Sequence, residues 1–328
     1  KNDPIVVDAN PKRARLWLVN VETGKARQLT FGERHVWSFE WSRDGERLAI
    51  VTTKEPTFDE ACSTGDLLTI PASGGVPVHV AHFPVLPQSP VFVENDGQQA
   101  IAVICNGHRP NPVDSVWLAP LDGGEPKNAL PRHEGNVEGL TPVPGDPKRI
   151  AIRMVEHTHA HAYLCDPFTG KLEDITPPEM RKTGTITAGP SVSAGGSTLA
   201  VVWSGGSAPH EGYVAKAGMQ ATKLTNFGAS FAGRLSPTEI VTWQSDGWEI
   251  EGILTYPAGY EAGTRYPLIV EAHGGPSWQW EDYCFLDWHN WAQLMASNGF
   301  AVLAVNPRGS TGRGAEFQQQ LQDDVGGG

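Results

Sequence analysis

The residues His273, Gly274, Gly275 and Pro276 directly follow an apolar stretch, YPLIVEA, in the C-terminal part of the sequence. Two glycines and a proline must end a strand, because glycine weakens the ladder and proline lacks the N–H. At the carboxyl edge of a parallel sheet, a Gly-Gly step exposes backbone N–H groups and admits a substrate closely. Such groups can stabilise the charge that develops on a carbonyl oxygen during acyl transfer. A plain tight turn explains the same residues equally well.

Polar loops in the first 230 residues contain further candidate binding residues. The stretch EHTHAHA places His157, His159 and His161 at alternate positions, hence on one side of an extended chain. Three imidazoles can bind zinc or copper, but a solvated loop edge is the more frequent explanation, so no metal is expected. Arg109 is suited to hold a substrate carboxylate, although a polar rim without a specific role remains the alternative. Trp278 either lines a substrate pocket or is buried between domains.

The elements that must position these residues are repetitive. A short strand, a Thr-Gly or Gly-Gly turn and a second strand recur, with turn glycines at positions 24, 75, 124, 170 and 218. A second hairpin lies between successive units. Two hairpins per period are typical of the four-stranded blade of a β-propeller. The repeats predict an all-β propeller over residues 1–228, incomplete at about four and a half blades.

The pattern changes after a predicted linker at residues 229–238. Residues 239–328 read as a strand pair followed by strand, helix, strand and helix, which predicts parallel pairing and a doubly wound sheet. The first helix is expected to end at Gly299. Its apolar stripe is formed by Trp288, Trp291, Ala292 and Met295.

A propeller followed by HGGPSW and then by NPRGSTGRG resembles the prolyl oligopeptidase family of serine peptidases, in particular its acylaminoacyl-peptidase-like and dipeptidyl-peptidase-like branches. The resemblance covers nearly the whole chain. It implies that residues 239–328 are the N-terminal part of an α/β-hydrolase catalytic domain, in which Gly275 supplies an oxyanion N–H. It also implies that two groups of residues shape the neighbouring loops: His273, Gly274 and Pro276 in one, Arg308 and Ser310 in the other.

The sequence departs from this family at the catalytic triad. No Gly-x-Ser-x-Gly nucleophile elbow occurs in the 328 residues, and a serine without its base and oxyanion partners is an ordinary alcohol. We therefore expect a fragment that is inactive alone, its Ser-Asp-His triad lying beyond the chain. No adjacent Glu-Glu pair occurs. Because the resemblance links such a pair to dipeptidyl peptidases, its absence favours the acylaminoacyl or oligopeptidase branch.

Composition limits the remaining possibilities. A net charge of −12 argues against nucleic acid, and the apolar runs are too short to cross a membrane. Four scattered cysteines match no metal or redox spacing and favour a cytoplasmic location. The expected function is hydrolysis of short peptides without a cofactor, with those peptides and the remainder of the catalytic domain as partners. An α/β-hydrolase esterase and a non-enzymatic propeller scaffold are the alternatives. Residue preference, exo- or endopeptidase action and homo-oligomer formation stay open.

Overall fold

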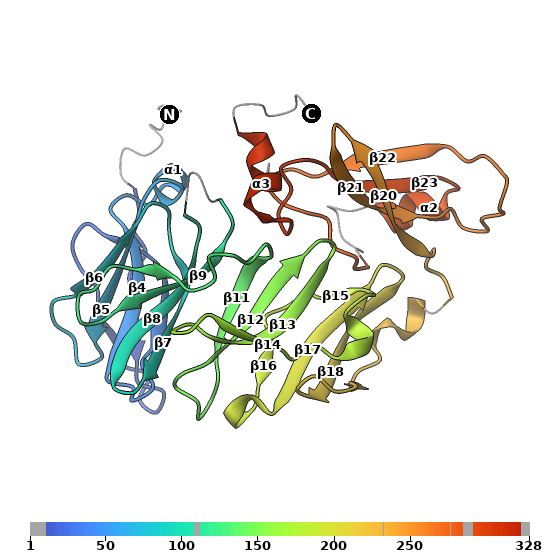
Figure 1. Cartoon of the computed structure of the whole chain (residues 1–328). Coiled ribbons are helices and arrows are strands. Elements are labelled where there is room, and N and C mark those ends of the chain that lie inside the picture. The colour runs from blue at the N-terminus through green and yellow to red at the C-terminus, as the bar shows by residue number, and fades with distance from the viewer. Residues whose placement is uncertain (1–10, 108–111, 232, 276, 285–290, 323–328) are drawn as a thin grey trace, which may run out of the picture. The chain divides into compact units, whose positions relative to one another are not determined.

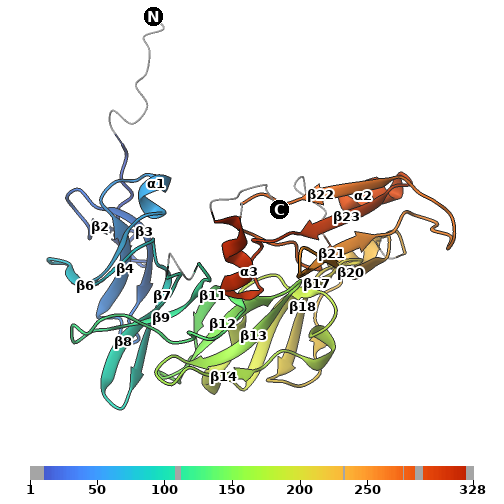
Figure 2. The same cartoon turned by 45° about the horizontal axis from the view of Figure 1, so that its top comes forward.

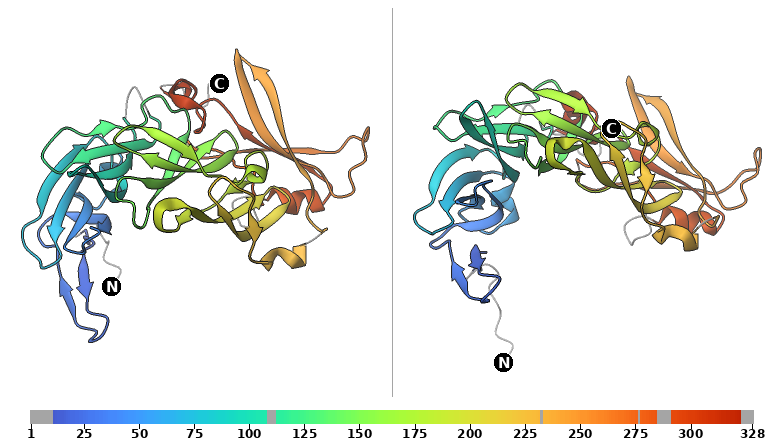
Figure 3. Two further views of the ribbon diagram at one scale, coloured as in Figure 1. Left: turned by 60° about the horizontal axis from the view of Figure 1, so that its bottom comes forward. Right: turned by 90° about the horizontal axis from the view of Figure 1, so that it is seen from below.

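The computed structural model describes residues 11–107, 112–231, 233–275, 277–284 and 291–322. Its strands form successive sheets in chain order (Figure 1). Figure 3 shows the same sheets in two further orientations. The chain divides into two compact units. One comprises residues 1–108 and 116–129, the other residues 109–115 and 130–328.

The first unit consists of a two-stranded ribbon and two four-stranded antiparallel sheets. The ribbon pairs β1 (Trp17–Val19) with β2 (Ala26–Gln28). One sheet contains β3 (His35–Trp41), β4 (Arg47–Thr53), β5 (Gly65–Pro71) and β6 (Val78–Phe83). The other contains β7 (Gln88–Asn95), β8 (Gln98–Cys105), β9 (Ser115–Pro120) and β10 (Lys127–Asn128). A single helical turn, α1 (Phe58–Ala61), lies between β4 and β5 and is capped by the Thr57 side chain.

Middle strands of these sheets are the most apolar ones, because both of their faces are covered. The last six residues of β4, LAIVTT, are all buried, and so are the last six residues of β8, AIAVIC. Val51, Leu67, Ile101 and Val103 pack in one core that joins the two sheets face to face. The predicted periodic hairpins therefore build stacked four-stranded sheets.

The second unit begins with two more antiparallel sheets. The first contains β11 (Asn136–Pro142), β12 (Ile150–Glu156), β13 (His159–Asp166) and β14 (Lys171–Asp174). The next contains β15 (Thr185–Ile186), β16 (Ser191–Val192), β17 (Thr198–Gly205), β18 (Ala208–Lys216) and β19 (Thr222–Lys223). Short 3-10 turns occur at Pro178–Met180, Ala194–Gly196 and Phe227–Phe231. Ala151, Leu164, Ile186 and Leu199 belong to the core that these two sheets share.

A mixed sheet ends the described chain. Its order is β20 (Thr238–Ser245), β21 (Trp248–Thr255), β23 (Ala301–Asn306) and β22 (Leu268–Ala272). The β20–β21 and β21–β23 pairs are antiparallel, whereas β22 and β23 are parallel and lie side by side (Figure 2). Because parallel strands end at the same edge, the chain leaves β22 and β23 at neighbouring points. Two short helices follow the strands: α2 (Ala292–Ser297) and α3 (Gly314–Gln318), the latter continued by a 3-10 turn at Gln319–Leu321.

The first predicted helix exists and stops before Gly299, whose φ of +89° ends it as expected. Its apolar stripe was predicted wrongly in part. Trp291 is the N-cap and is 50% exposed, while the buried residues are Ala292, Gln293 and Ala296. Trp288 lies outside the described residues. The predicted linker at 229–238 and the domain bounds on either side of it stay predictions. Within the described part of the chain, no helix is long and apolar enough to span a bilayer.

Candidate active site

The loops that leave β22 and β23 meet through one side chain, His273. Its Nδ1 lies 2.9 Å from the Gly274 carbonyl oxygen, and its Nε2 lies 2.9 Å from the Ser310 Oγ. The two motifs predicted from the sequence, HGGP and NPRGS, are therefore in direct contact.

The protonation of His273 follows from its surroundings. Burial lowers the pKa of His273, against the opposing effect of the Gly274 carbonyl, and so favours the neutral ring at pH 7. A neutral imidazole has one N–H and one acceptor nitrogen. The Gly274 carbonyl oxygen can only accept, so Nδ1–H donates to it, and Nε2 shares the single Ser310 hydroxyl hydrogen with the Pro307 carbonyl.

This hydrogen bond orients the peptide between Gly274 and Gly275. In a trans peptide the C=O and the N–H point in opposite directions. A Gly274 carbonyl held toward His273 therefore directs the Gly275 N–H away from the ring. Gly275 is exposed, and no acceptor for its N–H occurs among the described residues. The result is an oriented, unused donor at the edge of the sheet, which is what an oxyanion hole requires.

The two glycines differ in what the fold demands of them. Gly275 has a φ of +135°, and a Cβ there would lie 3.1 Å from the Ser277 backbone. Its lack of a side chain is therefore a requirement of the backbone. At Gly274 an added Cβ would meet nothing within 4 Å, so the protein itself has room for a side chain. Space left open by Gly274 is available to a bound molecule. Pro276 lies outside the described residues.

The loop after β23 is held tightly. Ser310 is 1% exposed, and its Oγ also lies 2.7 Å from the Pro307 carbonyl oxygen. A buried hydroxyl engaged on two sides is a structural group rather than a nucleophile. Arg308 forms a 3.3 Å ion pair with Asp246 in the turn between β20 and β21.

Trp278 and Trp280 pack beside His273. The ring centroids of Trp278 and His273 are 5.7 Å apart, and those of the two tryptophans are 5.0 Å apart. Trp280 is buried, whereas Trp278 is 37% exposed. Trp278 thus keeps a free surface next to the Gly-Gly step.

The three histidines of EHTHAHA do not gather at one point. His157 has a φ of +59° and occupies the turn before β13, so it does not continue the alternation of the strand. Its Nδ1 lies 3.0 Å from Glu251 Oε2, while His159 contacts the Gly184 carbonyl and His161 contacts Glu156. Among the described residues no group of three or more His, Cys, Asp or Glu is arranged to hold a metal.

Loops between second and third strands of the second unit do contact the C-terminal segment. The His157 N–H donates to the Gly312 carbonyl at 2.9 Å, and the Gly206 N–H donates to Asp282 at 3.1 Å. Arg109, predicted to face a substrate from an equivalent loop, lies outside the described residues.

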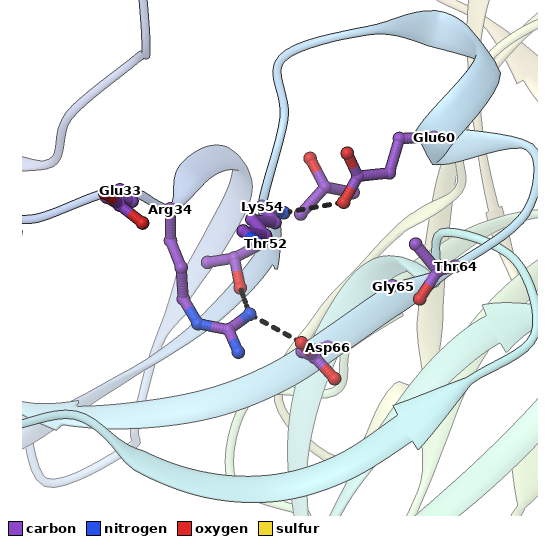
Figure 4. A pocket seen from close by; sticks show the side chains of 9 residues that line it. Glu33, Arg34, Thr52, Lys54, Glu60, Thr64, Gly65 and Asp66 are labelled. Carbon is purple, nitrogen blue, oxygen red and sulfur yellow. Dashed lines mark hydrogen bonds and ion pairs between the residues drawn. The ribbon is translucent and has the colours of Figure 1, made fainter.

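A pocket lies in the first unit, close to α1 (Figure 4). This pocket has a volume of about 420 Å³ and is lined by charged and hydroxyl side chains. Arg34 bonds Asp66 and Thr52, and the Glu60 carboxylate accepts from the Lys54 N–H. These groups satisfy one another within the blade, so the pocket does not point to a particular ligand.

Sequence reasoning missed three polar residues directly after the HGGPSW motif. Gln279, Glu281 and Asp282 are buried, and each bonds to a propeller-type sheet. No local pattern marks them, because their partners are distant in the sequence.

Comparisons with known proteins find similar sequences and similar folds. A family model described as the prolyl oligopeptidase family matches residues 287–328. The uncharacterized peptidase YuxL of Bacillus subtilis is 36% identical over 122 residues, which are 36% of this chain and 18% of that protein. A dipeptidyl-peptidase 5 of Arthroderma otae is 24% identical over 307 residues, which cover 88% of this chain and 41% of that protein. The chain thus spans less than half of these curated relatives.

Solved structures share the fold. A Mycobacterium tuberculosis puromycin-hydrolyzing peptidase superposes with a TM-score of 0.66 at 18% identity, covering 92% of this chain and 46% of that one. The Pyrococcus horikoshii acylaminoacyl peptidase gives a TM-score of 0.59 at 18% identity, over 95% and 57% of the two chains. The predicted fold class, propeller blades followed by the start of an α/β-hydrolase domain, is confirmed. The predicted resemblance to the prolyl oligopeptidase family is confirmed as well.

Proposed function

We propose that this chain contributes propeller blades and the oxyanion loop of a serine peptidase that hydrolyses short peptides in the cytoplasm. The observation that carries the proposal is the Gly274–Gly275 peptide, oriented by His273 at the edge of the sheet, whose N–H has no acceptor in the part of the chain that the structure describes. Likeness to peptidases in both sequence and fold supports it.

In the proposed reaction, a serine from outside this sequence attacks the scissile carbonyl. Negative charge then grows on the carbonyl oxygen, and the Gly275 N–H donates to it. A second N–H beside the nucleophile completes the oxyanion hole in α/β-hydrolases. His273 and Ser310 take no proton from the substrate; they hold the donor in place. The exposed face of Trp278 offers an apolar wall for a substrate side chain.

Labelling with a fluorophosphonate tests the proposal, since this reagent reacts with an activated serine. We expect the full-length protein to be labelled and the 328-residue chain to stay unlabelled, because Ser310 is buried and engaged. Hydrolysis of short peptides by the full-length protein, without hydrolysis of a folded protein that contains the same peptide sequences, would support the proposed substrate class. Labelling of the 328-residue chain, or turnover of simple esters but not of peptides, would contradict the proposal.

A further inference from the structure

We propose that Arg153, on propeller strand β12, is a positioning residue for the candidate oxyanion loop. It acts through Glu281, within residues 278–282, which we call the anchor segment. The expected effect on turnover rests on the proposed function, whereas the contacts that connect Arg153 to the candidate oxyanion loop do not.

Arg153 has donors engaged on three sides. It is 7% exposed, and its Nη2 lies 2.6 Å from Glu281 Oε2. Its Nε donates to the Ile186 carbonyl at 2.6 Å, and its Nη1 pairs with Glu138. A guanidinium bound this way has one orientation, so the position of Glu281 is fixed by the blade.

Glu281 in turn depends on that cation. The carboxylate is 7% exposed and receives a second hydrogen bond from the Thr185 hydroxyl at 2.6 Å. Burial raises the pKa of Glu281, so loss of the opposing Arg153 charge would favour its protonated form. Removing one partner of a buried ion pair is strongly destabilising, because the remaining group must either stay charged without compensation or take up a proton.

The next residue attaches the anchor segment to the following blade. Asp282 accepts the Gly184 N–H at 2.8 Å and the Gly206 N–H at 3.1 Å, and its own N–H donates to the Thr158 carbonyl at 2.8 Å. At Gly206 an added Cβ would lie 2.1 Å from the Thr238 Oγ1, so the approach is too close for a side chain. Glu281 and Asp282 therefore insert together between loops of two sheets.

The same segment is bonded to the hydrolase side through its other residues. The Thr311 N–H donates to the Trp278 carbonyl at 3.1 Å, and the Asn306 side chain bonds both backbone groups of Trp280. Both tryptophan rings pack on His273, the residue that orients the Gly274 carbonyl. A continuous series of contacts thus leads from Arg153 to the donor at Gly275.

The test compares Arg153→Met with Arg149→Met in the full-length protein. Arg149 also forms ion pairs, with Asp146 and Glu173, but these are more exposed and do not contact the anchor segment. Misplacement of a catalytic group by about 1 Å can cost on the order of 10²-fold, so Arg153→Met should lower kcat by about 10- to 100-fold with KM changed less than about threefold. Arg149→Met should leave both constants unchanged.

Arg153→Met also destabilises the fold, because it leaves Glu281 buried without its partner. The double variant Arg153→Met with Glu281→Met therefore removes both buried charges. It should recover the stability of the wild type while kcat stays low. Amide exchange in the 328-residue chain gives a readout independent of activity: the Trp280 and Thr311 N–H groups should exchange at least about tenfold faster in the double variant. Wild-type kcat or unchanged exchange in that double variant would overturn the positioning role. An inactive wild-type full-length protein would instead overturn the proposed function alone.

Discussion

The side-chain amide of Asn306 bonds both backbone groups of Trp280. Its Oδ1 accepts the Trp280 N–H at 2.7 Å, and its Nδ2 donates to the Trp280 carbonyl at 2.9 Å. Asn306 is the last residue of β23 and is 1% exposed. Its side chain thus does for Trp280 what a neighbouring strand would do with its backbone, and so joins the anchor segment to the mixed sheet.

Replacement of Asn306 by Asp tests this pairing. The carboxylate keeps the acceptor but loses the donor, and it places a negative charge against the Trp280 carbonyl. We expect Asn306→Asp to lower the free energy of unfolding at pH 7 by about 1–3 kcal/mol, the usual cost of an unsatisfied buried group. Protonation of the acid restores a donor, so the loss relative to the wild type should shrink near pH 4. Asn298→Asp, at the exposed end of α2, is the matched control, and an equal loss in both variants would refute the assignment.

Gly274→Ala and Gly275→Ala should separate catalysis from folding. Gly274 has space for a methyl group and no positive φ, so its alanine variant should keep its melting temperature while turnover falls in the full-length protein. Gly275→Ala forces a side chain into a φ of +135° and should cost about 1–3 kcal/mol of stability. Thermal unfolding and kcat of both variants check the expectation. Full activity of Gly274→Ala would mean that no substrate approaches that residue.

Ser310→Ala removes the hydroxyl whose single hydrogen is shared between His273 Nε2 and the Pro307 carbonyl. The ring should then lose its fixed tautomer and hold the Gly274 carbonyl less firmly. We expect about a tenfold loss of kcat, within the range that general positioning effects reach. The ¹⁵N chemical shifts of the His273 ring report the tautomer directly in the 328-residue chain. Unchanged shifts would show that Pro307, rather than His273, is the partner that matters for Ser310.

His157 should make stability depend on pH. The hydrogen bond that His157 donates to the Glu251 carboxylate raises the pKa of His157, with a smaller contribution from Glu249. Burial and the Arg313 charge oppose this rise of the pKa. A raised folded-state pKa stabilises the fold fully below the unfolded value of about 6.5, and this contribution is lost as pH rises through the folded value. His157 is 54% exposed, so the effect should stay below about 1 kcal/mol.

The variant His157→Asn isolates this contribution, because asparagine tolerates the φ of +59° at that position. The difference in unfolding free energy between wild type and variant should decrease from pH 6 to pH 8 in urea titrations. Other histidines titrate equally in both proteins and cancel. A difference that stays constant over this range would show that His157 is not charged at pH 6.

Sequence alone predicted the repeating sheets because their signals are local: a turn glycine and an alternating strand lie within a few residues. The family resemblance placed His273 and Ser310 in neighbouring loops, and in the structure their side chains meet where the carboxyl ends of the parallel strands β22 and β23 share an edge. Sequence reasoning missed the pairing of Arg153 with Glu281, because residues 128 positions apart form no local sequence pattern. The histidine alternation was misleading at one end, because His157 takes a left-handed turn that periodicity cannot foresee.

Asp282 and Gln293 bond opposite ends of one residue, Gly206: the carboxylate accepts its N–H and the amide donates to its carbonyl. We therefore expect that the propeller sheets and the C-terminal mixed sheet are not freely exchangeable between related proteins. A chimera that replaces the β17–β18 turn must bring a glycine with the same two backbone groups in register, or lose both bonds at once. The propeller sheets and the C-terminal sheet would therefore have to evolve together. A substitution near position 206 would require compensating substitutions at positions 282 and 293.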